Sequence, residues 1–174
     1  SRKKSTIPVI KESADRVGRT FNDFVKFIED NPNLPIVEMD TVHGTRSGKV
    51  LLTFMFRNCS LMLAFIIESC SQTAVKDFID KLYEVLGHEV FKRNFPVILT
   101  DNGSEFKNPQ ALELDAEGNQ ITKIFYCNPM ASYQKPHVEK NHEYIRYIIP
   151  KGKPFNNRTQ EDITLMMNHI NSTC

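Results

Sequence analysis

Three acidic residues of this chain stand where they could share divalent metal ions. Asp40 lies within the strand-like run "IVEMDTV", Asp101 directly follows the apolar run "FPVILT", and Glu139 lies in the helical stretch "QKPHVEKNHEYIRYI". Carboxylate oxygens are the ligands that Mg²⁺ and Mn²⁺ prefer, and two such ions can clamp the attacking and leaving oxygens of a phosphodiester. These residue types point to metal-dependent phosphoryl transfer as the candidate chemistry.

Each acid also has an interpretation that needs no shared site. Alternation along a strand places Glu38 and Asp40 on one face, and in a strand near the sheet edge both would simply lie in water. Asp101 begins Asp-Asn-Gly, which is a common turn sequence. The polar residues around Glu139 follow helical spacing, which is typical of a solvated helix face. They are Glu139, His142, Glu143 and Arg146. From the residue types alone, both interpretations stay open.

Five apolar runs are typical of β-strands that could position these acids. They are residues 36–42, 50–56, 61–68, 96–100 and 123–127. The glycines of "HGTRSGK" predict a hairpin loop between the first two runs. The run at 96–100 lacks polar alternation, which predicts a parallel or mixed sheet that is covered on both faces.

Four helices are predicted around these strands, at residues 20–31, 72–87, 135–149 and 159–170. Capping pairs open the first and the last of them: Thr20 with Asp23, and Thr159 with Asp162. Gly87 ends the second helix, and a proline is tolerated in the first turn of the third. The stretch "NPQALELDAEGNQITK" is expected to be an exposed excursion. Strands that alternate with helices in this way predict an α/β three-layer fold.

Composition limits the class of protein. The 174 residues suit one domain with a real core, and a net charge of +1 gives no overall electrostatic footprint for nucleic acid. The sequence contains no run of about 18 apolar residues, so no membrane-spanning helix is predicted. The scattered cysteines form no C-x-x-C pair, which favours a reducing, cytoplasmic compartment over a disulfide framework or a zinc site. They are Cys59, Cys70, Cys127 and Cys174.

Three segments carry a family resemblance: "MDTV", "TDNGSEF" and "YCNPMASYQKPHVEKNHEYIRYIIPKG". They resemble the catalytic core of DDE transposases and retroviral-type integrases, in particular the bacterial insertion-sequence branch called IS thirty. The resemblance covers roughly residues 34–170. It implies a ribonuclease-H-like fold, an α/β arrangement in which helices flank a central mixed five-stranded sheet. It also implies that Asp40, Asp101 and Glu139 form a catalytic triad that binds two Mg²⁺ or Mn²⁺ ions when substrate is bound.

The implied activity is DNA nicking at transposon ends, followed by strand transfer in which a 3′-hydroxyl attacks target DNA. Alternatives are a non-catalytic DNA-binding module derived from a transposase, and a ribonuclease-H-type nuclease. Residues 1–33 are then expected to be a basic arm and short helix that lead from an N-terminal DNA-binding region, and residues 34–174 the integrase-like core. The expected partners are transposon-end and target DNA and further copies of the full-length protein at the bacterial nucleoid, with no membrane or organic cofactor.

DNA contacts are expected beside the triad. Six basic residues against two acids between residues 135 and 158 give a local positive charge, which is a modest footprint for phosphates. The candidate contacts are Asn102, Tyr133, Gln134, Lys135, Lys140 and Arg146. Tyr133 could stack on a base or merely pack within its loop, and Asn102 could equally serve its turn. His142 is a weak candidate for a proton shuttle, while His43 and His88 are expected at turns or on the surface.

Glu139 and Glu143 compete for the third position of the triad. They lie four residues apart, about 5.4 Å along the helix axis, and metal coordination tolerates far less displacement. Val138 anchors the helix start, so Glu139 should lie nearest the strand ends. We expect Glu139→Gln in the full-length protein to abolish nicking and strand transfer of a labelled DNA end while the fold survives, and Glu143→Gln to keep most activity. An essential Glu143 with a dispensable Glu139 would place this helix one turn out of register.

Overall fold

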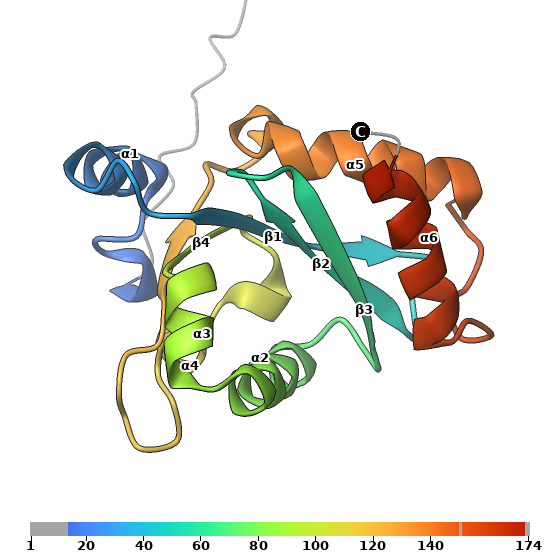
Figure 1. Ribbon diagram of the computed structural model, residues 1–174, viewed down its shortest axis with the longest axis horizontal. Helices are drawn as coiled ribbons and strands as arrows, with labels where there is room; N and C mark the ends of the chain where they lie inside the picture. The colour runs from blue at the N-terminus through green and yellow to red at the C-terminus, as the bar shows by residue number, and fades with distance from the viewer. Residues whose placement is uncertain (1–13, 150, 173–174) are drawn as a thin grey trace, which may run out of the picture.

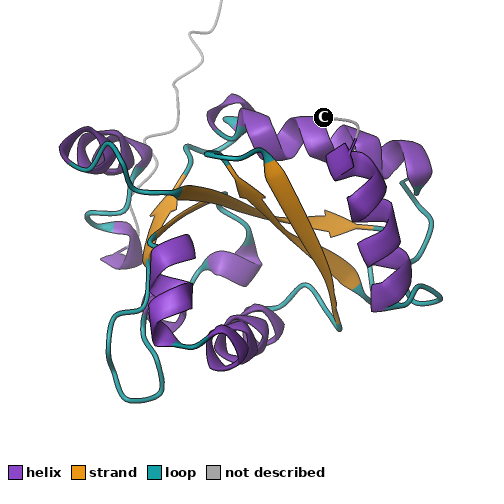
Figure 2. Ribbon diagram, in the orientation of Figure 1, coloured by secondary structure: helices purple, strands orange, loops and turns teal. Residues whose placement is uncertain are grey.

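The computed structural model describes residues 14–149 and 151–172. Its centre is a five-stranded sheet with the strand order β3-β2-β1-β4-β5 (Figure 1 and Figure 2). The strands are β1 (Ile36–His43), β2 (Val50–Phe56), β3 (Leu61–Ile67), β4 (Val97–Thr100) and β5 (Lys123–Tyr126). The first three pair antiparallel, whereas β4 is parallel to both β1 and β5. All five predicted strands are present, and the ribonuclease-H-like α/β fold class is confirmed.

The helices begin and end largely at the predicted signals. The α-helices are α1 (Phe21–Asp30), α2 (Gln72–Leu86), α3 (His88–Asn94), α4 (Pro109–Glu113), α5 (Pro136–Ile148) and α6 (Gln160–Ser172). Short 3-10 helices are η1 (Ala14–Arg16), η2 (Ser104–Phe106) and η3 (Ser132–Gln134). Both predicted capping pairs form, and Gly87 ends α2 with a φ of 80°. Within the described ranges, no helix has the length and apolar composition that crossing a bilayer would need.

Two features differ from the sequence-based prediction. The helix α3 was not predicted. Its seven residues follow Gly87 directly and form only two turns, which is too short for a helical repeat of apolar residues to be recognised. The predicted exposed excursion is wrong at its ends. Its first part forms α4, in which the Asn108 side chain caps the helix and Leu112 is buried, and Ile121 is buried near its other end. Only the intervening residues 116–120 are uniformly exposed.

Helices cover both faces of the sheet (Figure 1). On one face, buried side chains of α2, α3 and α4 join those of β1, β2, β4 and β5 in the largest apolar cluster. On the other face, α5 and α6 cover β1, β2 and β3. The remainder of that second face, over β4 and β5, is covered by α1. The sheet is therefore the middle of three layers, as predicted.

The central strand β1 alternates between these two layers. Val37 and Met39 are fully buried in the cluster beneath α2, α3 and α4. Glu38 and Asp40 point to the opposite face, where they are 0% and 7% exposed. The predicted alternation is confirmed, and the alternative of an edge strand with its acids in water is wrong, because β1 lies in the middle of the sheet.

The helix α1 is integrated into the folded unit. Phe24 is 1% exposed, and its ring lies 5.7 Å from that of Phe125 in β5. The apolar face of this helix is therefore a packing surface. The predicted basic arm falls mainly on residues 1–13, which lie outside the described residues, and the domain boundary between residues 33 and 34 stays a prediction.

Candidate active site

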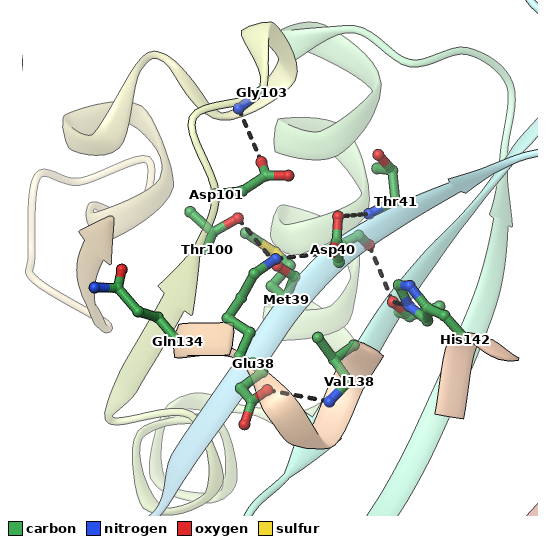
Figure 3. Close-up of polar contacts among 12 residues, drawn as sticks. Glu38, Met39, Asp40, Thr41, Thr100, Asp101, Gly103, Gln134, Val138 and His142 are labelled. Atoms are coloured by element: carbon green, nitrogen blue, oxygen red, sulfur yellow. Dashed lines mark hydrogen bonds and ion pairs between the residues drawn. The ribbon is translucent and has the colours of Figure 1, made fainter. Parts of the chain in front are cut away.

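The parallel pairing of β1 with β4 brings two of the predicted acids together. Glu38 stands opposite Leu99 in this register, and Asp40 and Asp101 each follow two residues later. Asp101 therefore follows the carboxyl end of β4, and Asp40 lies at the same level within the neighbouring strand β1 (Figure 3). In open α/β sheets, ligands bind in the crevice at such strand ends.

Asp101 is fixed by the turn that follows β4. Its Oδ1 accepts a hydrogen bond from the Gly103 N–H at 2.8 Å, which is the Asx-turn that Asp-Asn-Gly favours. Asn102 donates its side-chain N–H to the Cys127 carbonyl at 2.7 Å and so ties the turn to the end of β5. The turn role considered for Asn102 is thus present, and a DNA contact by this residue stays a prediction.

Asp40 is held by a buried ion pair with Lys135. The Lys135 Nζ lies 2.8 Å from Asp40 Oδ2, and the lysine is 1% exposed. Burial lowers the pKa of Lys135, but attraction to Asp40 and Asp101 and the hydrogen bond to Asp40 outweigh it, so the pKa is raised overall. The ammonium therefore stays charged beside the two aspartates.

Glu38 performs a different task from Asp40, although both lie on one face of β1. Its Oε1 accepts a hydrogen bond from the Val138 N–H at 3.1 Å (Figure 3). The helix α5 has no side-chain cap of its own, because Lys135 stands at the N-cap without capping it. Glu38 thus satisfies an N–H that has no partner within the helix and places a negative charge at the positive end of the helix dipole.

The other Glu38 oxygen lies close to Arg57 and His137. The Arg57 Nε donates to Glu38 Oε2 at 2.6 Å, and Nδ1 of His137 lies 3.1 Å from the same oxygen. The Arg57 guanidinium also donates to the Gln134 carbonyl at 3.0 Å. This network fixes the start of α5, and with it the turn that carries Glu139, against the central strand.

His142 is linked to the backbone of Asp40 through the Thr53 hydroxyl. Its Nε2 is 2.8 Å from the Thr53 hydroxyl, which donates its proton to the Asp40 carbonyl. Nε2 is therefore the donor to Thr53. Burial, and secondly the charges of Lys135 and Arg146, lower the pKa of His142 to about 3. A neutral imidazole at physiological pH argues for a positioning role and against the proton shuttle that we considered.

The remaining triad and DNA candidates lie on or before α5. The side chains of Glu139 and Lys140 lie outside the described residues, although both belong to this helix. Tyr133 is 75% exposed and free to meet a ligand. Gln134 is 7% exposed, and its Oε1 accepts the Asn128 N–H at 2.7 Å, which stabilises the loop.

The basic candidates have different surroundings from those expected. Lys135 is buried against Asp40 and does not reach the surface. Arg146 is half-buried, and one of its Nη atoms has no hydrogen-bond partner among the described residues. No ion pair between Glu143 and Arg146 forms within the described part of the chain. The DNA contacts of these residues stay predictions.

Known proteins resemble this chain over most of its length. No protein-family model matches it. It is 27% identical over 139 residues to a protein named integrase ORF3 of Spiroplasma virus SpV1-R8A2 B, which covers 80% of this chain and 41% of that protein. It is 32% identical over 136 residues to the transposase for insertion sequence element IS4351 of Bacteroides fragilis. This match covers 78% of this chain and 39% of that transposase. The chain is a relative of transposases and integrases.

This relationship confirms the family resemblance at the level of transposases and integrases. The assignment to the IS thirty branch stays a prediction. The chain spans less than half the length of these two curated relatives.

Sequence reasoning missed the roles of Glu38, Arg57 and Thr53 in this transposase relative. A signal for Glu38 was present, because it shares a strand face with Asp40 and needs a partner if buried. Arg57 and Thr53 offered no such signal, since their importance comes from the pairing of β1 with β2, in which Thr53 stands opposite Asp40.

The lowered pKa of His142 predicts a specific pH dependence of stability. Between its unfolded pKa of about 6.5 and its folded pKa of about 3, the unfolded chain binds a proton that the folded chain does not. Stability that is fully present above pH 6.5 is therefore lost as the pH falls. We expect the free energy of unfolding to fall more steeply for wild type than for His142→Asn between pH 7 and pH 4. The two slopes should differ by up to about 1.4 kcal/mol per pH unit.

Urea unfolding at several pH values measures this difference. The matched control is His169→Asn, since His169 is exposed on α6 and should give the wild-type slope. Parallel pH profiles for wild type and His142→Asn would show that His142 is not held neutral.

Proposed function

We propose that this chain is the catalytic core of a DNA transposase that nicks transposon ends and transfers the freed 3′-hydroxyl to target DNA. The observation that carries the proposal is the placement of Asp40 within β1 and of Asp101 just after β4, at the same level of two parallel strands. The start of α5, which bears Glu139, is bonded to the same face of β1 through Glu38. The names of the two relatives support the same class of polynucleotidyl transfer.

The donor set fits Mg²⁺ or Mn²⁺. Asp40, Asp101 and Glu139 offer only hard carboxylate oxygens, which these ions prefer. The Lys135 ammonium keeps a raised pKa despite burial, because Asp40 and Asp101 attract it, and this supports a preference for positive charge beside the two aspartates. We propose that the three acids hold two ions when DNA is bound. When bound, such ions supply Lewis-acid stabilisation of the charge that develops on phosphate oxygens.

The residues of the chain hold the acids in place for this chemistry. Asp40 Oδ1 accepts the Thr41 N–H at 2.7 Å, and Asp101 Oδ1 accepts the Gly103 N–H. Each aspartate therefore has a fixed orientation before substrate arrives. Positioning of this kind lowers the reorganisation that the reaction requires, which is where most electrostatic catalysis arises.

DNA would approach from the α5 side of the sheet. Lys151, Lys153 and Arg158 are exposed in the connection from α5 to α6, and Tyr133 is exposed just before α5. We propose that the basic side chains contact phosphates and that Tyr133 stacks on a base. Further proposals are a dimer or higher oligomer of the full-length protein and an action on DNA in the bacterial cytoplasm.

A strand-transfer assay on the full-length protein tests the function. With Mn²⁺ and a labelled transposon end, wild type should give nicked and joined products, and EDTA should abolish both. Asp101→Asn removes a proposed metal ligand, so it should lower the rate by at least the roughly 100-fold that loss of a residue supporting such a ligand can cost. The control Asp30→Asn changes an exposed aspartate at the end of α1 and should leave the rate unchanged. An active Asp101→Asn enzyme would contradict the proposal.

A further inference from the structure

One buried carboxylate among the described residues has no cationic partner there, whereas the others do. Four carboxylate side chains are buried among the described residues: Glu38, Asp40, Glu105 and Glu113. Ion pairs join Arg57 to Glu38, Lys135 to Asp40 and Arg19 to Glu113. Glu105 is 7% exposed and has no ion pair within the described part of the chain. A buried charge without a counter-charge is costly, so Glu105 calls for a cation.

The fold holds the Glu105 carboxylate firmly in this position. Its Oε1 accepts a hydrogen bond from the Thr41 hydroxyl at 2.7 Å. A Cβ at position 103 would lie 2.5 Å from Glu105 Oε2, so only glycine leaves room for the carboxylate. The Thr41 hydroxyl is also 4.0 Å from Cys70 Sγ. Two neutral donors, the Thr41 hydroxyl and the Cys70 thiol, and a close glycine position the charge but do not compensate it.

The side chains next to Glu105 are of types that can bind a metal ion. A nitrogen of His43, the sulfur of Cys70 and a carboxylate oxygen of Glu105 all lie within 4.8 Å of one another. His43 ends β1, Cys70 lies between β3 and α2, and Glu105 lies in η2. Only the fold brings these three segments together, which is why cysteine spacing gave no hint of a metal site.

We propose that His43, Cys70 and Glu105 bind a transition-metal ion of the Zn²⁺ class. One imidazole, one thiolate and one carboxylate form a ligand set that Zn²⁺ accepts, with water free to complete the tetrahedron. The thiolate makes the site unsuitable for Mg²⁺, which takes oxygen ligands. The ion supplies the positive charge that Glu105 lacks.

This site is separate from the triad. Thr41 and His43 alternate with Asp40 along β1, so their side chains lie on the other face of the sheet, with η2 and α2. Glu105 follows Asp101 by four residues. Gly103 donates its N–H to Asp101, and the Glu105 carboxylate occupies the space that a side chain at position 103 would need. A metal ion here therefore braces the turn that presents Asp101, and it does so whether or not the triad performs strand transfer.

Co²⁺ is the probe, because Zn²⁺ has no visible spectrum. Reduced, chelator-treated protein is titrated with CoCl₂ in an absorption spectrometer. We expect a thiolate-to-cobalt charge-transfer band and visible bands of a tetrahedral site that saturate at one ion per chain and disappear when Zn²⁺ is added. Cys70→Ser should remove the charge-transfer band. His43→Gln and Glu105→Gln should weaken Co²⁺ binding by at least about tenfold.

Three control variants identify the ligand and separate this site from the triad. Cys59→Ser and Cys127→Ser should keep the band, because neither thiol belongs to the cluster. Asp40→Asn should also keep it, since carboxylate-bound Co²⁺ gives no thiolate band. A wild-type protein without the band, or a Cys70→Ser protein that retains it, would overturn the proposal. Circular dichroism of each variant confirms that the fold is intact when the spectra are compared.

Discussion

The burial of two carboxylates on one face of the central strand determines much of this structure. Glu38 and Asp40 are almost completely removed from water within β1. Charges in such a place require counter-charges and hydrogen bonds. Lys135 pairs with Asp40, and Arg57 pairs with Glu38 while also binding the carbonyl before Lys135. The cations that neutralise the carboxylates of this strand thus also hold the residues at the start of α5 in place.

This constraint divides the work between two chemically similar residues. Glu38 binds the first turn of α5 and so fixes the position of the turn that carries Glu139. Asp40, in contrast, faces Asp101 and Lys135. Pro136 suits this arrangement, because a proline in the first turn has no N–H to leave unsatisfied. Fewer N–H groups of the first turn therefore need an external acceptor, and the central strand provides the acceptor for Val138.

The sequence predicted what depends on local pattern and missed what depends on distant contacts. Alternation in β1, the capping residues of α1 and α6, and the stop at Gly87 were readable because their physical causes lie within a few residues. The short helices α3 and α4 offered too few turns for a periodic signal. Lys135 resembled a surface cation, since nothing near it in sequence shows that Asp40 lies beside its ammonium. Glu105 and its neighbours were invisible for the same reason.

The most direct test of this account is amide hydrogen exchange at Val138. Its N–H lies in the first turn of α5, so its protection depends on the acceptor that Glu38 provides. Glu38→Met should speed exchange at Val138 by about tenfold or more, the effect of losing a hydrogen bond to a charged group, while core amides of β2 stay protected. The control Glu143→Gln, on an exposed face of the same helix, should leave Val138 unchanged. Equal protection of Val138 in wild type and Glu38→Met would show that the buried carboxylate does not hold the helix that carries Glu139.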